Sequence, residues 1–317
     1  MAPLATSHLA PVLAPAQLLP IAAVAILYAQ RARTLAREGR PVPGLRQASF
    51  YGGLGVILFA LLSPIGRLSD DLLSVHMVEH LLMGDVGALL LVLGLTAQVI
   101  APLLRIRFID RLRVLANPLV AFPLWAIDLY LWHLPLLYQA ALRHSGIHAL
   151  QHLCFIGFGA NMWMCLFGPL PMPAWFGNLQ KLVYIIAVRL TGAILGNIFL
   201  WSGTVFYPDY AKGEAYWHVS PITDQNLAGA VMMIEGSILT ILLFGWLFFK
   251  TARESDERQA LLDFAAASGL ELSDERAARA VAAGRGAELR RRLEARAGQI
   301  APAGEELLAG PARIEGV

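Results

Sequence analysis

Long apolar segments recur along the chain and are separated by short polar stretches. Each is close to the 20 or so mostly apolar residues that an α-helix needs to cross the hydrocarbon core of a bilayer. They lie at residues 10–29, 48–65, 73–101, 118–137, 147–170, 181–201 and 227–249. The third is longer than a span requires, so we expect it to tilt or to extend beyond the hydrocarbon. The pattern predicts an all-α, polytopic membrane protein with about seven transmembrane helices.

Composition agrees with this class. Hydrophobic residues make up 57% of the 317 residues and charged residues only 15%, against roughly a quarter charged in an ordinary soluble domain. A soluble fold could not bury so much apolar side chain, whereas a lipid bilayer accommodates it. We find no phosphate-binding loop, soluble catalytic constellation or nucleic-acid surface. Cys154 and Cys165 share one apolar run, and a rigid helix would hold them too far apart for a disulfide.

Basic residues divide the loops into two classes. The loops after the first and third segments and the stretch after the last are rich in them: Arg31, Arg33, Arg37, Arg40, Arg46, Arg105, Arg107, Arg111, Arg113, Lys250 and Arg253. The other loops are poor in basic residues. Because cytoplasmic loops carry the excess of Lys and Arg, we predict an outside N-terminus and a cytoplasmic C-terminus. No signal-peptide cleavage pattern is evident, so we expect the first segment to be retained.

The chain changes character after residue 250. We predict a transmembrane domain over 1–250 and a charged, partly helical cytoplasmic tail over 251–317. Ser-Asp-Glu-Arg sequences begin at Ser255 and Ser273, and serine followed by acidic residues is typical of a helix start. The basic run from Arg285 to Arg296 is interpreted as a solvated helix face, with contact to anionic lipid as the alternative.

Histidines concentrate at the predicted outer ends of the spans. His76 and His80 begin the third segment, His133 ends the fourth, and His148 and His152 begin the fifth. Residues four apart share one helix face, with Cβ atoms about 6 Å apart. A lone membrane histidine typically hydrogen-bonds a neighbouring helix. Two pairs and a fifth histidine at one depth instead predict a ligand site in the outer half of the bilayer, since polar groups in lipid are costly.

The nature of the ligand follows from the donor set. Two imidazole pairs facing each other suit a single small ion, and Met83 continues the face of His76 and His80 one turn deeper. Histidine and methionine suit copper, and the thioether favours Cu(I). Met83 taken alone is more typical of packing. Haem is the alternative, with His80 and His152 as axial ligands, but doubled pairs on each helix suit a small ion better.

The third segment also contains a short protease-like motif. His76-Met77-Val78-Glu79-His80 has the pattern H-x-x-E-H, found in one class of zinc protease. So short a motif occurs often by chance. Protease chemistry would also need a further metal ligand and a water-filled cleft, so we do not favour it.

Four ionisable residues lie deep in the predicted spans: Asp85, Asp128, Arg189 and Glu235. An isolated charge at the bilayer centre costs at least about 2.5–3.5 kcal/mol. We therefore expect Arg189 to pair with one or more of the carboxylates. Such a network either fixes the arrangement of the helices or forms part of a proton or ion route, and the sequence leaves both open.

Five motifs follow one another along the membrane region. They are Ser63-Pro64-Ile65, His76-Met77-x-x-His80-Leu81-Leu82, Trp132-His133-Leu134-Pro135-Leu136-Leu137-Tyr138, His148-x-x-x-His152 and Asp224-Gln225-x-x-Ala228-Gly229. With them the chain resembles the CtaG-type cytochrome c oxidase assembly factors, multi-span bacterial membrane proteins, from about Ser63 to Glu235. Glu79 and Glu235 depart from the family's pattern, which has a neutral residue, often glutamine, at the first position and often proline at the second.

The resemblance implies a role in maturing a haem-copper oxidase, at the step of copper insertion. We hypothesise a non-enzymatic assembly factor of the bacterial plasma membrane whose partner is a cytochrome c oxidase subunit. Copper would be held transiently by His76, His80, His148 and His152, with His133 as a fifth candidate. Relatives linked to copper uptake make a copper transporter the alternative. A transporter should carry polar residues through the inner leaflet, where the third to fifth segments are mostly apolar.

Overall fold

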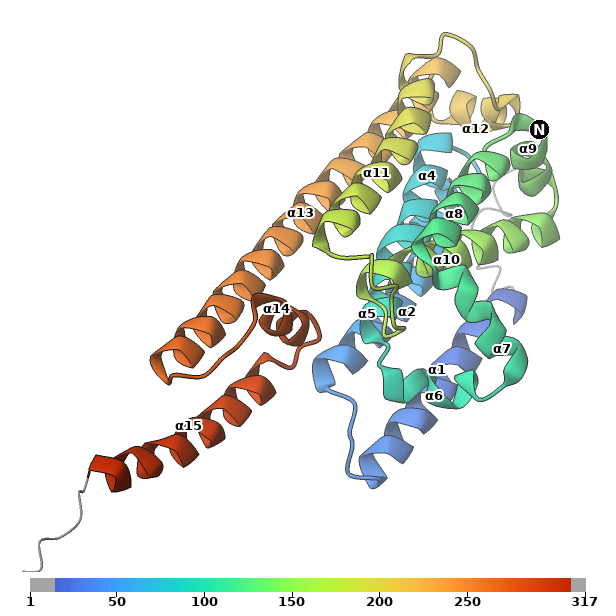
Figure 1. Ribbon diagram of the computed structural model, residues 1–317. Coiled ribbons are helices and arrows are strands. Elements are labelled where there is room, and N and C mark those ends of the chain that lie inside the picture. The colour runs from blue at the N-terminus through green and yellow to red at the C-terminus, as the bar shows by residue number, and fades with distance from the viewer. Residues whose placement is uncertain (1–14, 309–317) are drawn as a thin grey trace, which may run out of the picture. The chain divides into compact units, whose positions relative to one another are not determined.

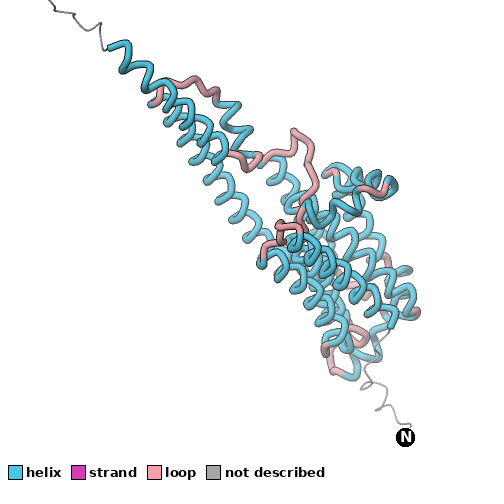
Figure 2. The backbone as a smooth tube through the Cα atoms, turned by 90° about the horizontal axis from the view of Figure 1, so that it is seen from below, coloured by secondary structure: helices cyan, strands magenta, loops and turns pink. Residues whose placement is uncertain are grey.

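A computed structural model describes residues 15–308, and within that range every regular element is helical (Figures 1 and 2). By its contacts the chain divides into two units, residues 1–241 and 242–317. The first contains α1 (Pro15–Arg37), α2 (Gly44–Leu62), α3 (Pro64–Leu68), α4 (Leu73–Leu81), the π-helical turn η1 (Leu82–Gly87), α5 (Ala88–Gly94), α6 (Ala97–Leu104), α7 (Arg107–Arg111), η2 (Leu112–Ala116), α8 (Pro118–Trp132), α9 (Pro135–Arg143), α10 (Ser145–Phe167), α11 (Asn178–Trp201), η3 (Pro208–Tyr210) and α12 (Ala211–Tyr216). Helix α13 (Pro221–Ala267) contributes to both units, and α14 (Asp274–Ala282) and α15 (Gly286–Leu308) complete the second.

Five of the described helices are long and apolar enough to cross a membrane. They are α2, the continuous helix Leu73–Gly94 made of α4, η1 and α5, then α10, α11 and α13. A sixth span results if Arg107–Ala116 and α8, which meet at an angle of 81°, are counted together. The protein is therefore an all-helical membrane protein with five to six such spans in its described part, against the seven expected. The described part of the first expected span, in α1, does not meet this test, and residues 10–14 lie outside the described range.

Two expected spans are shorter than the hydrophobic pattern predicted. Helix α8 ends at Trp132 rather than near residue 137, because Pro135 starts a separate helix, α9. Proline cannot donate to the preceding turn and disfavours a helical conformation in the residue before it. The third span ends at Gly94 rather than near residue 101. Leu95 is extended, and the Thr96 side chain caps α6 by accepting from the Val99 amide.

The last expected span, 227–249, is part of a much longer helix. Helix α13 runs for 47 residues and continues to Ala267, so no break in the helix marks the expected boundary at 250. Ser255, expected at a helix start, lies inside α13, whereas Ser273 directly precedes α14. The second unit has an apolar core of its own, formed by Leu261, Val281, Leu289 and Leu293.

Glycines bring the third span close to its neighbours. A Cβ atom added at Gly159 of α10 would lie 2.1 Å from the carbonyl oxygen of Gly84 in η1. One added at Gly53 of α2 would lie 2.8 Å from the carbonyl oxygen of Gly87. Real Cβ atoms do not approach so closely, so these contacts require glycine. The contact of Gly159 with Gly84 holds α10 and the third span close enough for side chains near the N-terminal ends of α4 and α10 to meet.

Candidate metal centre

Two helices bring four imidazoles together. His76 and His80 on α4 have ring centroids 4.2 Å apart, as do His148 and His152 on α10. Across the helices, the His76 and His148 rings stack at 5.2 Å, and His80 meets His152 edge to face at 5.4 Å. Three of these side chains are buried and His148 is half-buried. The structure thus brings together the two pairs that the sequence singled out.

Most of the ring nitrogens in this cluster have no hydrogen-bond partner. His76 Nδ1 lies 3.1 Å from the Ser69 carbonyl oxygen, so Nδ1 carries the proton and Nε2 offers its lone pair. The buried atoms without a partner include His76 Nε2, His148 Nε2 and both ring nitrogens of His80 and His152. Each such group costs about 1–3 kcal/mol when it stays unsatisfied. A bound cation would satisfy several of them at once.

Two sets of side chains in the described chain are close enough to hold one ion. The first is His76, His80 and His148, and the second is Glu79, His148 and His152. In each set the three ligand atoms lie within 4.8 Å of one another. Ligand atoms around an ion at about 2.0–2.2 Å lie within about 4.4 Å of each other, so small side-chain rotations complete either set. This buried cluster can therefore hold a metal ion.

Two further candidates, His133 and Met83, differ in their surroundings. His133 ends α8, and its Nδ1 lies 2.6 Å from the Leu129 carbonyl oxygen, which leaves Nε2 as a free acceptor. It belongs to neither ion-binding set found among the described residues. Met83 is fully buried against Ile57 and Ala60, an environment typical of a packing residue.

Three tyrosines cover one side of the cluster, and the sequence analysis did not anticipate any of them as a site residue. Tyr138 lies 5.2 Å from the His76 ring, stacks on Tyr207 at 4.0 Å, and shares a 3.0 Å hydrogen bond with Tyr210. The Tyr207 hydroxyl donates to the His133 carbonyl oxygen at 2.7 Å. Tyr207 and Tyr210 come from the loop after α11. Their only sequence signal was the aromatic character of that loop.

Asp224, at the start of α13, holds the beginning of the histidine helix. Its carboxylate accepts hydrogen bonds from the amides of Leu73 and Ser74 and from the Ser74 hydroxyl. Leu72, the residue before α4, provides no side-chain cap of its own. Asp224 is 1% exposed. A residue about 150 positions away along the chain therefore provides the missing cap and positions His76 one turn further on.

A second acidic side chain lies buried nearby, in α12. Glu214 is 3% exposed, and its Oε2 atom has no hydrogen-bond partner. Burial and, to a smaller extent, the charge of Asp224 together raise the pKa of Glu214 to about 7. This carboxyl group therefore changes its charge near neutral pH.

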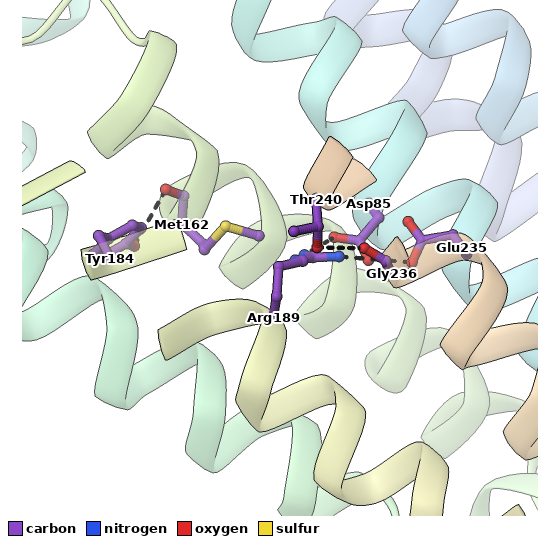
Figure 3. Close-up of polar contacts among 7 residues, drawn as sticks. All are labelled: Asp85, Met162, Tyr184, Arg189, Glu235, Gly236 and Thr240. Atoms are coloured by element: carbon purple, nitrogen blue, oxygen red, sulfur yellow. Dashed lines mark hydrogen bonds and ion pairs between the residues drawn. The ribbon is translucent and has the colours of Figure 1, made fainter. Parts of the chain in front are cut away.

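Deeper along the third span, one arginine meets two acids. Figure 3 shows Arg189 of α11 pointing between Asp85 of η1 and Glu235 of α13. Its guanidinium nitrogens lie 3.5 Å from Asp85 and 3.7 Å from Glu235. Arg189 also lies over the Trp163 ring at 5.8 Å. The three charged residues link three helices, and the acid in the π-helical turn is one of them.

Asp128, the fourth deep charge, takes no part in this triad. The described residues show no ion pair between Asp128 and Arg189. Its side chain lies beside that of Trp132 instead. Asp128 and Trp132 are four residues apart on α8, so this contact is local to one helix. The network expected from sequence is thus made of Asp85, Arg189 and Glu235 without Asp128.

Comparison with known proteins identifies the chain's relatives. Residues 26–254 match the family described as cytochrome c oxidase caa3 assembly factor (Caa3_CtaG). Uncharacterized proteins of Mycobacterium bovis and Mycobacterium tuberculosis are each 24% identical over 265 residues, covering 76% of this chain. The matched part is 40% of each relative's length, so the chain spans well under two thirds of these relatives. No solved structure matches. Because the family match covers most of the chain, including all of the histidine cluster, the chain belongs to the caa3 cytochrome c oxidase assembly factor family.

Proposed function

We propose that this protein is a non-enzymatic assembly factor that holds copper for a haem-copper cytochrome c oxidase. The observation that carries the proposal is the set of buried, unpartnered imidazole nitrogens on α4 and α10. His76, His80 and His148 form the copper position, and His152 completes the cluster. His133, at the edge of the cluster, and Met83, three residues after His80 along the chain, are additional candidates. Imidazole nitrogen suits copper, and a neutral three-imidazole set accepts Cu(I) without a counter-charge.

We also propose the orientation that brings this site to its partner. With α1 as a seventh span, the arginine-rich loops lie in the cytoplasm and the histidine ends of α4 and α10 face outward. A protein of the bacterial plasma membrane would then present copper at the outer leaflet to an oxidase subunit. The half-buried His148 provides the route by which the ion reaches and leaves the cluster.

Haem fits this site less well than a small ion. The His80 and His152 rings are 5.4 Å apart and nearly perpendicular. One to two turns deeper, Gly84 and Gly159 are in backbone contact. A macrocycle between the two histidines would force α4 and α10 apart. A haem protein would also show a Soret band when purified.

A copper transporter is the second candidate. The triad of Asp85, Arg189 and Glu235 favours it, because it places charged groups deeper on the helix that carries His76 and His80. The mostly apolar inner halves of the third to fifth expected spans argue against it. Copper uptake into vesicles containing the purified protein distinguishes transport from delivery.

Copper stoichiometry tests the proposal directly. Protein purified in detergent is loaded anaerobically with Cu(I), washed, and measured by elemental analysis. We expect about one copper per chain in the native sequence and loss of that copper in the double variant His76→Ala, His80→Ala, since two of three ligands are gone. His144→Ala, an exposed histidine just before α10, is the matched control and should keep its copper. Absence of copper from the native protein would refute the proposal.

A further inference from the structure

Glu79 adds a carboxylate to a cluster otherwise composed of imidazoles. We propose that Glu79, His148 and His152 form a second position, specific for a divalent cation, which overlaps the Cu(I) position at His148. The inference rests on the proposed function in one respect, because it takes the set His76, His80 and His148 as the Cu(I) position. The protein would then accept ions of two charge types at adjoining positions in one cluster.

The geometry brings the carboxylate into the cluster. Glu79 lies between the two histidines of α4 and is 2% exposed. One of its oxygens lies within 4.8 Å of ligand atoms of both His148 and His152. Ser69, whose carbonyl oxygen orients His76, also lies beside the Glu79 side chain. One residue is therefore next to a ligand of each set.

The carboxylate has no cationic partner in the described part of the chain. No lysine or arginine there forms an ion pair with Glu79, and its Oε2 atom has no hydrogen-bond partner. A buried carboxylate is stable only if it is protonated or if a cation lies against it. A bound metal ion would supply that positive charge and would also coordinate one of the unpartnered nitrogens of His152.

The two sets of ligands differ in charge, and this difference determines which ion each set prefers. Two histidines and one glutamate form a set that zinc occupies in several metalloproteins. The negative charge of Glu79 favours a divalent ion over a monovalent one, and carboxylate oxygen is a harder ligand than imidazole nitrogen. The set of three imidazoles lacks that charge. Because both sets require His148, an ion in one position weakens binding at the other.

The experiment compares Zn(II) with Cu(I) in purified full-length protein. Zn(II) serves as the probe for the divalent position because it has no redox chemistry. We expect Glu79→Gln to weaken Zn(II) binding at least about tenfold, as losing even an outer-shell partner does, and to change Cu(I) affinity less than about twofold. His80→Ala should do the reverse. Glu79→Asp, which keeps the charge, should bind Zn(II) more tightly than Glu79→Gln.

Competition tests the overlap. Loading the native protein with Cu(I) should lower the amount of Zn(II) bound, whereas independent occupancy would overturn the shared role of His148. Equal Zn(II) affinity in the native protein and Glu79→Gln would overturn the second position, as would equal loss of both ions. If the native protein binds Zn(II) but no Cu(I), the proposed function fails while the divalent position stands. If Glu79→Gln does not elute as a monodisperse protein, the Zn(II) and Cu(I) affinities of Glu79→Asp and His80→Ala are compared instead to test the second position.

Discussion

The histidines of the cluster differ in how firmly the protein holds them. The Nδ1 atoms of His76 and His133 each hydrogen-bond a backbone carbonyl, which fixes the tautomer and orientation of the ring. His80 and His152 have no hydrogen bond at either nitrogen. The cluster therefore combines oriented ligands with ligands whose rotation is limited only by packing. Such a combination suits an ion that is bound and later released.

The cap from Asp224 predicts a measurable coupling between distant parts of the chain. Asp224→Ala leaves the first amides of α4 without an acceptor and should cost about 1–2 kcal/mol of stability. Because His76 lies in the first turn of α4, copper affinity should fall as well. Thermal unfolding and copper titration in detergent measure the two effects.

The surface ion pair between Asp209 and Arg143 provides the control for that variant. Exposed pairs contribute about 0–1 kcal/mol, so Asp209→Asn should change little. Equal losses of copper affinity in Asp224→Ala and Asp209→Asn would contradict the capping role.

Glu214 predicts a pH dependence of stability. Its pKa is about 7 in the folded protein, above the ordinary value of 4.5 that it regains on unfolding. Between these values the folded state binds more protons, so the free energy of unfolding falls as the pH rises from about 4.5 to 7. Glu214→Gln should flatten this part of the profile and be more stable than the native protein at pH 8.

Thermal unfolding at pH 5, 6, 7 and 8 checks this expectation. Glu38→Gln, at an exposed position after α1, is the control and should keep the native slope. If Glu214→Gln retained the native slope, the buried carboxyl group would not be its cause.

For single residues, the sequence predicted the histidine pairs of the site but not the residues that surround them. The histidine pairs were predictable because a spacing of four is a property of one helix. Asp224 contacts α4 and Tyr207 contacts Tyr138 from far along the chain, and no local pattern reports such contacts. Glu79 was visible, but only within a protease-like motif that we did not favour.

Among the elements, the contact between η1 and α10 sets the separation of the two histidine pairs. Gly159→Ala would place a methyl group 2.1 Å from the Gly84 carbonyl oxygen. The helices must then move apart, at a cost of about 1–3 kcal/mol. We expect lower thermal stability together with weaker copper binding.

Gly157→Ala is the matched control for this change. Gly157 is on the same helix, is exposed, and has no atom within 4 Å of an added Cβ. That variant should be neutral or gain about 0.5–1 kcal/mol, because alanine favours a helix. The same loss in both variants would mean that helix propensity, not close packing, explains the effect.

The element boundaries show what hydrophobicity alone does not report. Hydrophobicity predicts one span for each apolar run. In the structure, however, Pro135 starts a new helix within the fourth run, and the extended residue Leu95 ends the helix within the third. Conversely, α13 continues past its apolar stretch because the residues after Lys250 also favour a helix. The sequence analysis did not anticipate the π-helical turn, in which Gly84 packs against Gly159.

For the whole molecule, the distribution of arginine predicts which ends of the helices lie outside. Single cysteines introduced in a variant without Cys154 and Cys165 test this orientation. An impermeant maleimide should label Lys212→Cys in intact cells and Glu271→Cys only after the membrane is opened; both positions are exposed. Labelling of Glu271→Cys in intact cells would reverse the orientation and place the histidine cluster at the cytoplasmic face.

The family match ends at residue 254, inside α13. The second unit lies largely beyond it and has its own apolar core, with Arg290 stacked 3.6 Å over the Phe264 ring. The boundary expected at residue 250 stays a prediction.

The π-helical turn has a consequence for the evolution of this protein. A turn with i→i+5 hydrogen bonds takes up about one residue more than an α-helical turn. The wider turn absorbs that extra residue, so the histidines before it and the residues after it face as they would in a regular α-helix that is one residue shorter. Deleting one residue within 82–87 should therefore restore a regular α-helix and keep the metal ligands facing α10. A single-residue deletion in a regular part of the same span would instead turn the histidines by about 100° relative to the residues beyond it, and should impair function more.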